Sequence, residues 1–168
     1  MVLRIAELDD LLWIVAVYNS TIASRLSTAD LEPVSVESRT EWFMQHQVKN
    51  RPLWIAEEND VPIGWISLSD FKTRNAYHLT AEISVYLDEK HRGGGLGKLV
   101  LKEAIRCCEE LGIRNLVALI FSHNLASVKL FADAGFMEWG HLPEVAEMDG
   151  KLYSVKILGK KLGTNDNR

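Results

Sequence analysis

A strand, a glycine-rich loop, a long helix and a second strand follow one another in the middle of the sequence, and this succession constrains the fold most strongly. Residues 80–87 alternate between apolar and polar side chains, which is typical of a half-buried strand. A glycine-rich loop follows at 92–97, and apolar residues then recur at helical spacing from 96 to 111. The continuous apolar run at 116–121 predicts a buried strand. Such a succession favours a sheet with helices packed on it.

Other segments show weaker patterns of the same kinds. We predict strands at 2–6, 53–57, 61–69, 136–140 and 152–158, and helices from Asp9 or Asp10 to Tyr18, from Ser35 to Arg51 and from 124 to 134. Polar loops are expected at 19–31 and 71–79, and a turn at 58–60 makes two of the strands a hairpin. We therefore expect one α/β (α+β) domain over residues 1–162, with a polar, disordered tail at 163–168.

Composition and charge argue against several classes of function. The chain has 168 residues, of which 47% are hydrophobic and 25% charged, as in soluble globular proteins. Its formal net charge of -4 argues against a nucleic-acid partner, because proteins that bind phosphate backbones carry a basic face. Charged residues interrupt the N-terminal segment, and no apolar run is long enough to span a bilayer. We expect a cytoplasmic protein without a membrane partner.

The cysteines and histidines show no spacing that is typical of a metal site. Cys107 and Cys108 are neighbours on the predicted long helix, where they point in different directions. Cys107 falls on the apolar stripe of that helix, so we expect it in the core. The five histidines have no metal-ligand spacing with one another or with the cysteines, and no metal is expected.

The glycine-rich loop lies where a helix begins, and this position favours an anionic ligand. The first amides of a helix have no partners within it and the helix dipole is positive there, so a phosphate group is stabilised. Glycines let the backbone approach such a ligand closely, and Arg92 adds a positive charge. The loop therefore predicts a ligand that carries phosphate.

Two common nucleotide-binding signatures fail when the residues are counted. A Walker A loop requires glycine at position 92 and serine or threonine at position 99, but Arg92 and Leu99 stand there. A dinucleotide fingerprint requires glycine at position 98 or 100, where Lys98 and Val100 stand. Neither a P-loop nor a dinucleotide site is predicted.

The pattern that fits is Arg/Gln-x-x-Gly-x-Gly/Ala, present as Arg92 to Gly97, and it resembles the acyl-CoA loop of the GNAT superfamily of N-acetyltransferases. The flanking elements, and Asn124-x-x-Ser127 before Ala134-Gly135-Phe136, occur in the order that this superfamily uses. Further motifs make the chain similar to the phosphinothricin and methionine sulfoximine N-acetyltransferases; they are Tyr18-Asn19, Arg74-Asn75-Ala76-Tyr77 and Thr80 to Tyr86. The resemblance runs from Arg4 to about Leu158.

This resemblance implies a GNAT-like fold, with a mixed, mostly antiparallel, twisted sheet of six to seven strands flanked by about four helices. It also implies acetyl-CoA as co-substrate, with its pantetheine arm on the strand backbone and its pyrophosphate on the loop amides. Asn124 is expected to hydrogen-bond to the cofactor, although it can equally be a helix N-cap. The implied cofactor-binding residues are Val85, Tyr86, Leu87, Arg92, Gly93, Gly94, Gly95, Leu96, Gly97, Lys98, Asn124 and Ser127.

Glu82 is the candidate general base for acetylation of an amine. An aliphatic ammonium must lose a proton before it can attack a thioester, and a carboxylate with a raised pKa can accept that proton. Glu82 lies between apolar residues in the middle of a predicted strand, and the resemblance implies that the catalytic glutamate stands at this position. Strand patterns alone would favour a solvated, outward-facing side chain. Asp70 and Asp88 are rivals, but both lie at predicted strand ends and are typical of turns.

Arg74, Asn75 and Tyr77 are the candidate substrate-binding residues. The resemblance implies that the loop before the catalytic strand binds amino-acid-like substrates, and a guanidinium there can hold a carboxylate or phosphinate in bidentate fashion. A solvated loop arginine is the alternative interpretation of Arg74. Arg39 and Trp42 are secondary candidates, and Trp42 can equally belong to the core.

The sequence departs from its apparent relatives at two positions. Many superfamily members place a tyrosine seven residues after the asparagine, where it protonates the departing thiolate, but Phe131 stands there and is expected to serve packing. Water, the product ammonium or another group must then supply that proton, and Tyr86 is one option. Ser154 stands where many relatives carry an aspartate, which leaves the substrate open.

Three functions remain possible from the sequence. The first is N-acetylation of a small amino acid or analogue of the phosphinothricin, methionine sulfoximine or methionine sulfone type, a detoxification-like activity. The second is acetylation of protein or peptide N-termini on the same fold, and the third is a non-catalytic module that binds acyl-CoA. The resemblance also implies a homodimer, and the apolar residues Trp139, Leu142 and Val145 are compatible with an interface.

Overall fold

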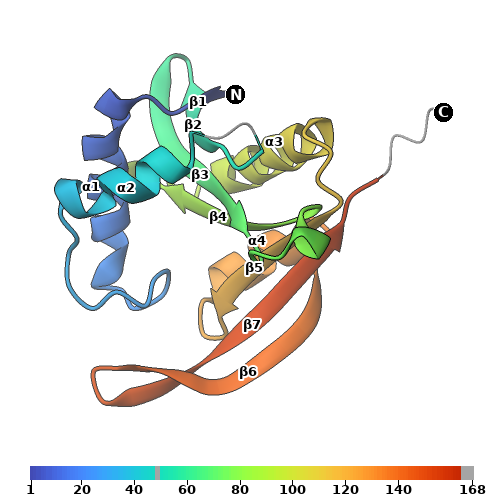
Figure 1. Ribbon diagram of the computed structural model, residues 1–168. Coiled ribbons are helices and arrows are strands. Elements are labelled where there is room, and N and C mark those ends of the chain that lie inside the picture. Colours follow the sequence, from blue (N-terminus) through green and yellow to red (C-terminus); the bar gives the residue numbers. More distant parts are fainter. Residues whose placement is uncertain (48–49, 164–168) are drawn as a thin grey trace.

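The sheet is the frame of the molecule, and Figure 1 shows it running through the centre of the computed structural model, which describes residues 1–47 and 50–163. Its order is β1-β2-β3-β4-β5-β7-β6. Every neighbouring pair is antiparallel except β4 and β5, which run parallel. The strands are β1 Val2–Ile5, β2 Leu53–Glu58, β3 Val61–Asp70, β4 Thr80–Leu87, β5 Asn115–Phe121, β6 Met137–Met148 and β7 Lys151–Lys161. The predicted fold class, a mixed and mostly antiparallel sheet, is confirmed.

Helices cover both faces of the sheet, two on each side. The α-helices are α1 Leu11–Ile22, α2 Val36–Gln45, α3 Leu96–Glu110 and α4 Leu125–Asp133, with short 3-10 turns at Leu8–Asp10, Asn75–Tyr77 and Glu89–His91. Helices α1 and α2 share one buried cluster with Leu53, Ile55 and Trp65 of the sheet. Helices α3 and α4 share another with alternate residues of the same strands, such as Trp54 and Ile66. Because side chains alternate along a strand, β2 and β3 contribute to both clusters.

Several predicted boundaries are confirmed by local contacts. Ser35 caps α2 by accepting a hydrogen bond from the backbone N–H of Ser38 at 3.1 Å. Asn59 and Asp60 form the turn between β2 and β3, and both have positive φ, as a tight hairpin requires. Strand β4 begins and ends where the alternation of the sequence predicted.

Other boundaries differ from the prediction. Helix α1 continues to Ile22. The hydroxyls of Ser20 and Thr21 donate hydrogen bonds to backbone carbonyls one turn earlier, so these polar side chains have their hydrogen-bond partners within the helix. Helix α2 ends at Gln45, several residues before Arg51. Strands β6 and β7 extend well beyond 140 and 158, and they pair with each other over most of their length.

The two neighbouring cysteines of α3 differ in burial. Cys108 is fully buried, whereas Cys107 is half-buried against the same core, so the apolar stripe of α3 is centred closer to Cys108 than predicted. No helix among residues 1–47 and 50–163 is long and apolar enough to cross a membrane. The tail prediction falls mostly on residues 164–168, which lie outside the described residues.

Candidate active site

Strands β4 and β5 separate part-way along their length, and this separation creates a cavity. The two strands pair only from Thr80 to Glu82 on β4 and from Asn115 to Val117 on β5. Beyond that point a cavity of about 350 Å³ lies between them. We call it the split cavity; it is lined by Leu26, Ser27, Thr28, Ala29, Glu82, Ile83, Ser84, Val85, Tyr86, Ala118, Leu119, Ile120, Phe121, Asn124, Ser127, Phe131 and Val155. The β4 edge that faces it makes no ladder hydrogen bonds to β5, so its backbone groups can bind an extended ligand.

The glycine-rich loop and the start of α3 lie next to the end of β4. Gly95 is the N-cap of α3 and has φ +79, a left-handed conformation that strains other residues. A Cβ built on Gly97 would lie 3.3 Å from a methyl of Leu87 at the end of β4 and 3.5 Å from Leu130 on α4. Arg92 donates from Nε to the carbonyl of Leu87 at 3.0 Å. The start of α3 is thus held close to the last residue of β4.

Asn124 has two structural roles in this region. Its side-chain oxygen accepts from the backbone N–H of Ser127 at 3.1 Å, which confirms the predicted N-cap of α4. Its amide nitrogen donates to the carbonyl of Leu26 at 3.0 Å, and this bond ties the segment after α1 to α4. Asn124 is buried, yet it lines the split cavity together with Ser127.

Glu82 lies at the point where the two strands separate. Its side chain is half-buried and lines the split cavity. Burial raises the pKa of the Glu82 carboxyl above its ordinary value, and the positive charge of Lys72 partly opposes this shift. Strand patterns alone favoured a solvated, outward-facing side chain, whereas this side chain is half-buried and faces the split cavity. The rival Asp70 is an exposed partner of Arg51, and Asp88 accepts from the Lys90 N–H in a turn.

A second cavity of about 120 Å³ lies on the α1–α2 face of the sheet, against Ser84 and Tyr86 of β4. We call it the aromatic cavity; it is lined by Ile14, Val15, Tyr18, Val34, Arg39, Trp42, Trp65, Ser67, Ser69, Ser84 and Tyr86. Trp65 stacks on Tyr86 with ring centroids 4.3 Å apart, and Trp42 meets Trp65 edge-on at 5.8 Å. Ser84 and Tyr86 line both cavities, so the two cavities share a wall on β4.

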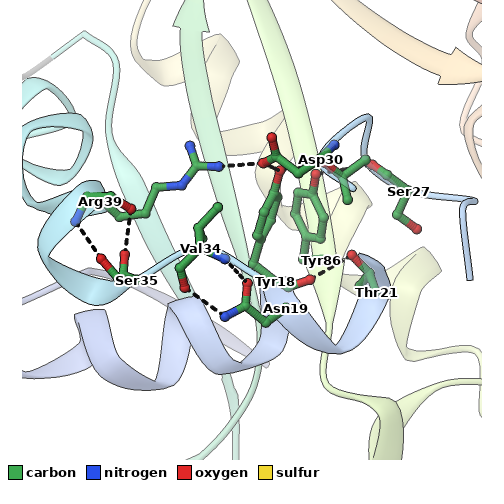
Figure 2. Close-up of polar contacts among 11 residues, drawn as sticks. Tyr18, Asn19, Thr21, Ser27, Asp30, Val34, Ser35, Arg39 and Tyr86 are labelled. Carbon is green, nitrogen blue, oxygen red and sulfur yellow. Dashed lines mark hydrogen bonds and ion pairs between the residues drawn. The ribbon is translucent and has the colours of Figure 1, made fainter. Parts of the chain in front are cut away.

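A polar network around Tyr18 closes one side of the aromatic cavity, and Figure 2 shows Tyr18 and Tyr86 next to each other beneath Asp30. The Tyr18 hydroxyl donates to Asp30 at 2.5 Å and contacts the Thr28 hydroxyl. Arg39 reaches the same Asp30 carboxylate at 2.8 Å and lies 4.9 Å above the Tyr18 ring. Burial, reinforced by Asp30, raises the pKa of Tyr18. This network holds Arg39 at the wall of the aromatic cavity. Arg39 is a secondary candidate for binding the substrate.

The predicted substrate loop is exposed, and neither cavity described above includes Arg74, Asn75 or Tyr77 among its lining residues. Arg51 holds both ends of this loop. Its guanidinium pairs with Asp70 at 2.7 Å and donates to the carbonyls of His78 and Thr80 at 3.0 and 3.3 Å. The sequence did not identify Arg51, because an arginine before a proline carries no signal of burial.

The two departures from the motif pattern have structural explanations. Phe131 is buried against Phe136, with ring centroids 4.9 Å apart, as the packing interpretation predicted. Phe131 also lines the split cavity. The Ser154 hydroxyl accepts from the backbone N–H of Glu144, which has a positive φ where the pairing of β6 and β7 is irregular.

Tyr86 is a poor proton donor as the chain stands. Its hydroxyl donates to the carbonyl of Ser27 at 3.2 Å. Burial raises the pKa of Tyr86, so the phenol holds its proton more tightly than usual.

The sequence also gave no signal for Trp65, Ser67 or Ser69, because these side chains of β3 are recognised as cavity residues only once β3 is paired with β4.

Comparisons with known proteins identify the family. Residues 14–136 match the model of the acetyltransferase (GNAT) family. The chain is 55% identical to "Putative phosphinothricin acetyltransferase YwnH" of Bacillus subtilis, covering 96% of this chain and 99% of that protein. It is 30% identical to the L-methionine sulfoximine/L-methionine sulfone acetyltransferase of Salmonella typhimurium, covering 96% and 95%.

A solved structure shows the same fold with a cofactor bound. The phosphinothricin acetyltransferase of Sinorhizobium meliloti, in complex with acetyl-CoA, superimposes with a TM-score of 0.89 at 27% identity, covering 99% of this chain and 91% of that one. The family match spans most of the described domain, and the relatives match over nearly their whole length. The chain therefore belongs to the acetyltransferase (GNAT) family and is an acyltransferase.

Proposed function

We propose that this enzyme transfers the acetyl group of acetyl-CoA to the primary amine of a small amino acid or amino-acid analogue, with Glu82 as the general base. The observation that carries the proposal is the position of Glu82, which lines the split cavity and stands opposite Ser69, a residue that lines the aromatic cavity. One cavity has the open strand edge that suits an extended cofactor, and the other has the size and polarity for a small acceptor. The names of the relatives, phosphinothricin and methionine sulfoximine acetyltransferases, support this acceptor class.

The split cavity is proposed to hold acetyl-CoA. The backbone of Val85, Tyr86 and Leu87 would bind the pantetheine arm along the edge that β5 leaves unpaired. The amides of residues 93–98 would bind the pyrophosphate, because the start of α3 is positive and lies next to Leu87. Asn124 and Ser127 line the cavity and would contact the arm from α4. The complex of the Sinorhizobium meliloti relative supports acetyl-CoA as the co-substrate.

The reaction follows from the raised pKa of Glu82. The acceptor arrives as an ammonium, and Glu82 removes one proton directly or through water. The nitrogen lone pair attacks the thioester carbonyl, a C–N bond forms, and the C–S bond breaks with its electron pair on sulfur. The nitrogen loses a second proton and the thiolate gains one. Because Phe131 cannot donate, water or the product ammonium supplies that proton.

The aromatic cavity is proposed to take the side chain of the acceptor. Its volume of about 120 Å³ suits a short chain rather than a peptide. Arg39, Ser67 and Ser84 offer hydrogen bonds to oxygen atoms of such a side chain. The Trp65 indole N–H also has no hydrogen-bond partner in residues 1–47 and 50–163, although it is buried. Arg74, Asn75 and Tyr77 stay proposed contacts for the acceptor carboxylate or phosphinate on the exposed side.

The test is release of CoA thiol from acetyl-CoA over a panel of amines. The panel contains methionine sulfoximine, methionine sulfone, phosphinothricin, standard amino acids, polyamines and short peptides. We expect turnover with the amino-acid analogues and a loss of about 100-fold or more in kcat for Glu82→Gln. Asp88→Asn is the matched control, because Asp88 is a turn residue outside both cavities. Turnover confined to peptides would contradict this proposal and indicate acetylation of protein or peptide N-termini. No turnover with any amine would also contradict it and indicate a non-catalytic module that binds acyl-CoA.

A further inference from the structure

His46 and Ser69 form a hydrogen-bonded pair beside the aromatic cavity, and the proposed function gives this pair no role. The His46 side chain is 5% exposed, and its ring lies 4.7 Å from that of Trp42. Its Nδ1 lies 2.7 Å from the carbonyl oxygen of Trp42, and its Nε2 lies 3.2 Å from the Ser69 hydroxyl oxygen. Ser69 lines the aromatic cavity, whereas His46 stands behind it.

The direction of both hydrogen bonds follows from elementary chemistry. A carbonyl oxygen only accepts, so Nδ1 of His46 must carry a proton. Burial lowers the pKa of His46, which favours the neutral ring with a single proton. Nε2 is then an acceptor, and the Ser69 hydroxyl must donate to it. Ser69 therefore has its oxygen lone pairs, rather than its proton, free for a ligand in the cavity.

Ser69 also stands directly across from the candidate base. Ser69 on β3 is the register partner of Glu82 on β4, so their side chains leave the same face of the sheet. Directly opposed Cβ atoms in antiparallel strands are about 5 Å apart. The two side chains thus offer two hydrogen-bond acceptors, one charged and one neutral, at neighbouring points. Two such acceptors match the several N–H donors of an ammonium group.

We propose that Ser69, held by His46, accepts an N–H of the acceptor amine and orients the nitrogen for attack while Glu82 removes its proton. The inference rests on the proposed function and adds a contact to it. Ser69 touches the substrate, and His46 is a positioning residue that acts through Ser69. The N–H kept by Ser69 fixes the rotation of the amine, so that the lone pair freed by Glu82 faces the split cavity.

The test is a double-mutant cycle on kcat/KM for methionine sulfone, or for the best amine of the panel. Ser69→Ala is expected to lower kcat/KM for the amine about 10-fold, because a hydrogen bond to a charged group is lost. The KM for acetyl-CoA should change less than about 2-fold, because Ser69 does not line the split cavity. Ser38→Ala is the matched control, since Ser38 is an exposed serine of α2 whose hydroxyl donates to the backbone of Ser35.

Two replacements of His46 separate positioning from packing. His46→Gln keeps an acceptor that can reach Ser69, and we expect kcat/KM within about 3-fold of the wild type. The asparagine of His46→Asn also carries an amide but is too short to reach Ser69. This variant should therefore lose as much kcat/KM as Ser69→Ala. The double variant Ser69→Ala/His46→Asn should be no worse than either single variant, because both remove the same contact. Thermal unfolding of each variant checks that the fold is retained.

The outcomes distinguish this inference from the proposed function beneath it. If the wild type acetylates amines but Ser69→Ala keeps full kcat/KM, the positioning role is wrong and the proposed function stands. Losses from Ser69 and His46 that multiply in the double variant would also overturn it, because they would show independent effects. If the wild type turns over no amine, the proposed function fails and the inference fails with it.

Discussion

Glu82 shares its face of β4 with Ser84 and Tyr86, so its carboxylate lies among polar and aromatic groups instead of in a purely apolar core. Partial burial raises the pKa of this carboxyl, and a positive charge on Lys72 lowers it. The net result is a raised pKa, so this carboxylate accepts a proton more readily than a solvated glutamate. A base with these properties must be deprotonated to act, which sets the sign of its pH dependence.

We predict that kcat/KM falls on the acid side with a midpoint above 4.5, the ordinary pKa of a glutamate. Replacing Lys72 by Met removes the charge that lowers the pKa of Glu82, so the acid limb should move to higher pH. Lys90→Met is the matched control, since Lys90 is an exposed lysine that does not act on the Glu82 pKa. The measurement is kcat/KM against pH for the three proteins. An acid limb that moves to lower pH in Lys72→Met would contradict the assignment of Glu82.

Asn124 caps the N-terminus of α4 and also donates a hydrogen bond to the distant carbonyl of Leu26. Two substitutions separate these two roles. Serine keeps the N-cap of α4 but cannot donate to the Leu26 carbonyl, so Asn124→Ser should cost about 1 kcal/mol of unfolding free energy. Asn124→Ala loses the cap as well and should cost about 1 kcal/mol more. Both should raise the KM for acetyl-CoA, because residues 26–29 form a wall of the split cavity. Urea unfolding and steady-state kinetics provide the two measurements, and equal stability of the two variants would disprove the separate roles.

At the scale of elements, the loop between β3 and β4 is held at its two ends by one buried arginine. Arg51 precedes β2, and its guanidinium contacts Asp70 at the end of β3 and the carbonyls of His78 and Thr80 at the start of β4. Asp70 is largely exposed, so the pair with Asp70 contributes little by itself. The hydrogen bonds to backbone carbonyls satisfy a charge that is otherwise buried.

We predict that Arg51→Met costs about 3 kcal/mol of unfolding free energy, because it leaves the loop carbonyls without their donor. If the loop binds the acceptor through Arg74, Asn75 and Tyr77, the same variant raises the KM for the amine and leaves that for acetyl-CoA unchanged. Arg106→Met is the matched control. Arg106 makes ion pairs with Glu103 and Glu110 on the surface of α3, and losing them should cost less than about 1 kcal/mol. Equal losses in denaturant titrations of the two variants would contradict the role of Arg51.

The succession of elements could be predicted from the sequence because periodicity is a local property. Strand β4 and the start of α3 were placed correctly by alternation and by the glycines. The end of α1 was not, because hydrogen bonds from Ser20 and Thr21 to their own helix have no signature in composition. The lengths of β6 and β7 were also missed, since exposed strands stabilised by each other need no apolar alternation.

The site could be predicted only in part. Motifs identified the strand of Glu82 and the loop at the start of α3, whereas the cavities between elements depend on pairing across the sheet. The aromatic cavity combines β3, β4, α1 and α2, which are far apart in the sequence. The placement of Ser69 opposite Glu82 follows from register, which a single strand does not specify.

At the scale of the whole molecule, the hairpin of β6 and β7 extends away from the helices, as Figure 1 shows for its two long strands. Strand β6 is the edge of the sheet, so one side of its backbone is unpaired in this order of strands. Trp139 packs on Gly159, where a Cβ would lie 2.0 Å from its ring, yet 42% of Trp139 stays exposed. Leu142 and Val145 are exposed on the same strand at 40% and 56%. Exposed apolar groups along an edge strand are typical of a protein interface.

We predict that two copies of the chain associate, as the family resemblance implies, that β6 forms the interface, and that the molar mass in solution is twice that of the chain. Val145→Asp should shift the protein to the monomer mass, because a charge would be buried at the interface without a partner. Val61→Asp is the matched control: Val61 is 50% exposed at the hairpin of β2 and β3, outside the proposed interface. Size-exclusion chromatography with light scattering, over a range of protein concentrations, measures the mass. A wild type that stays monomeric at all concentrations, or a dimer that Val145→Asp leaves intact, would show that β6 is not the interface.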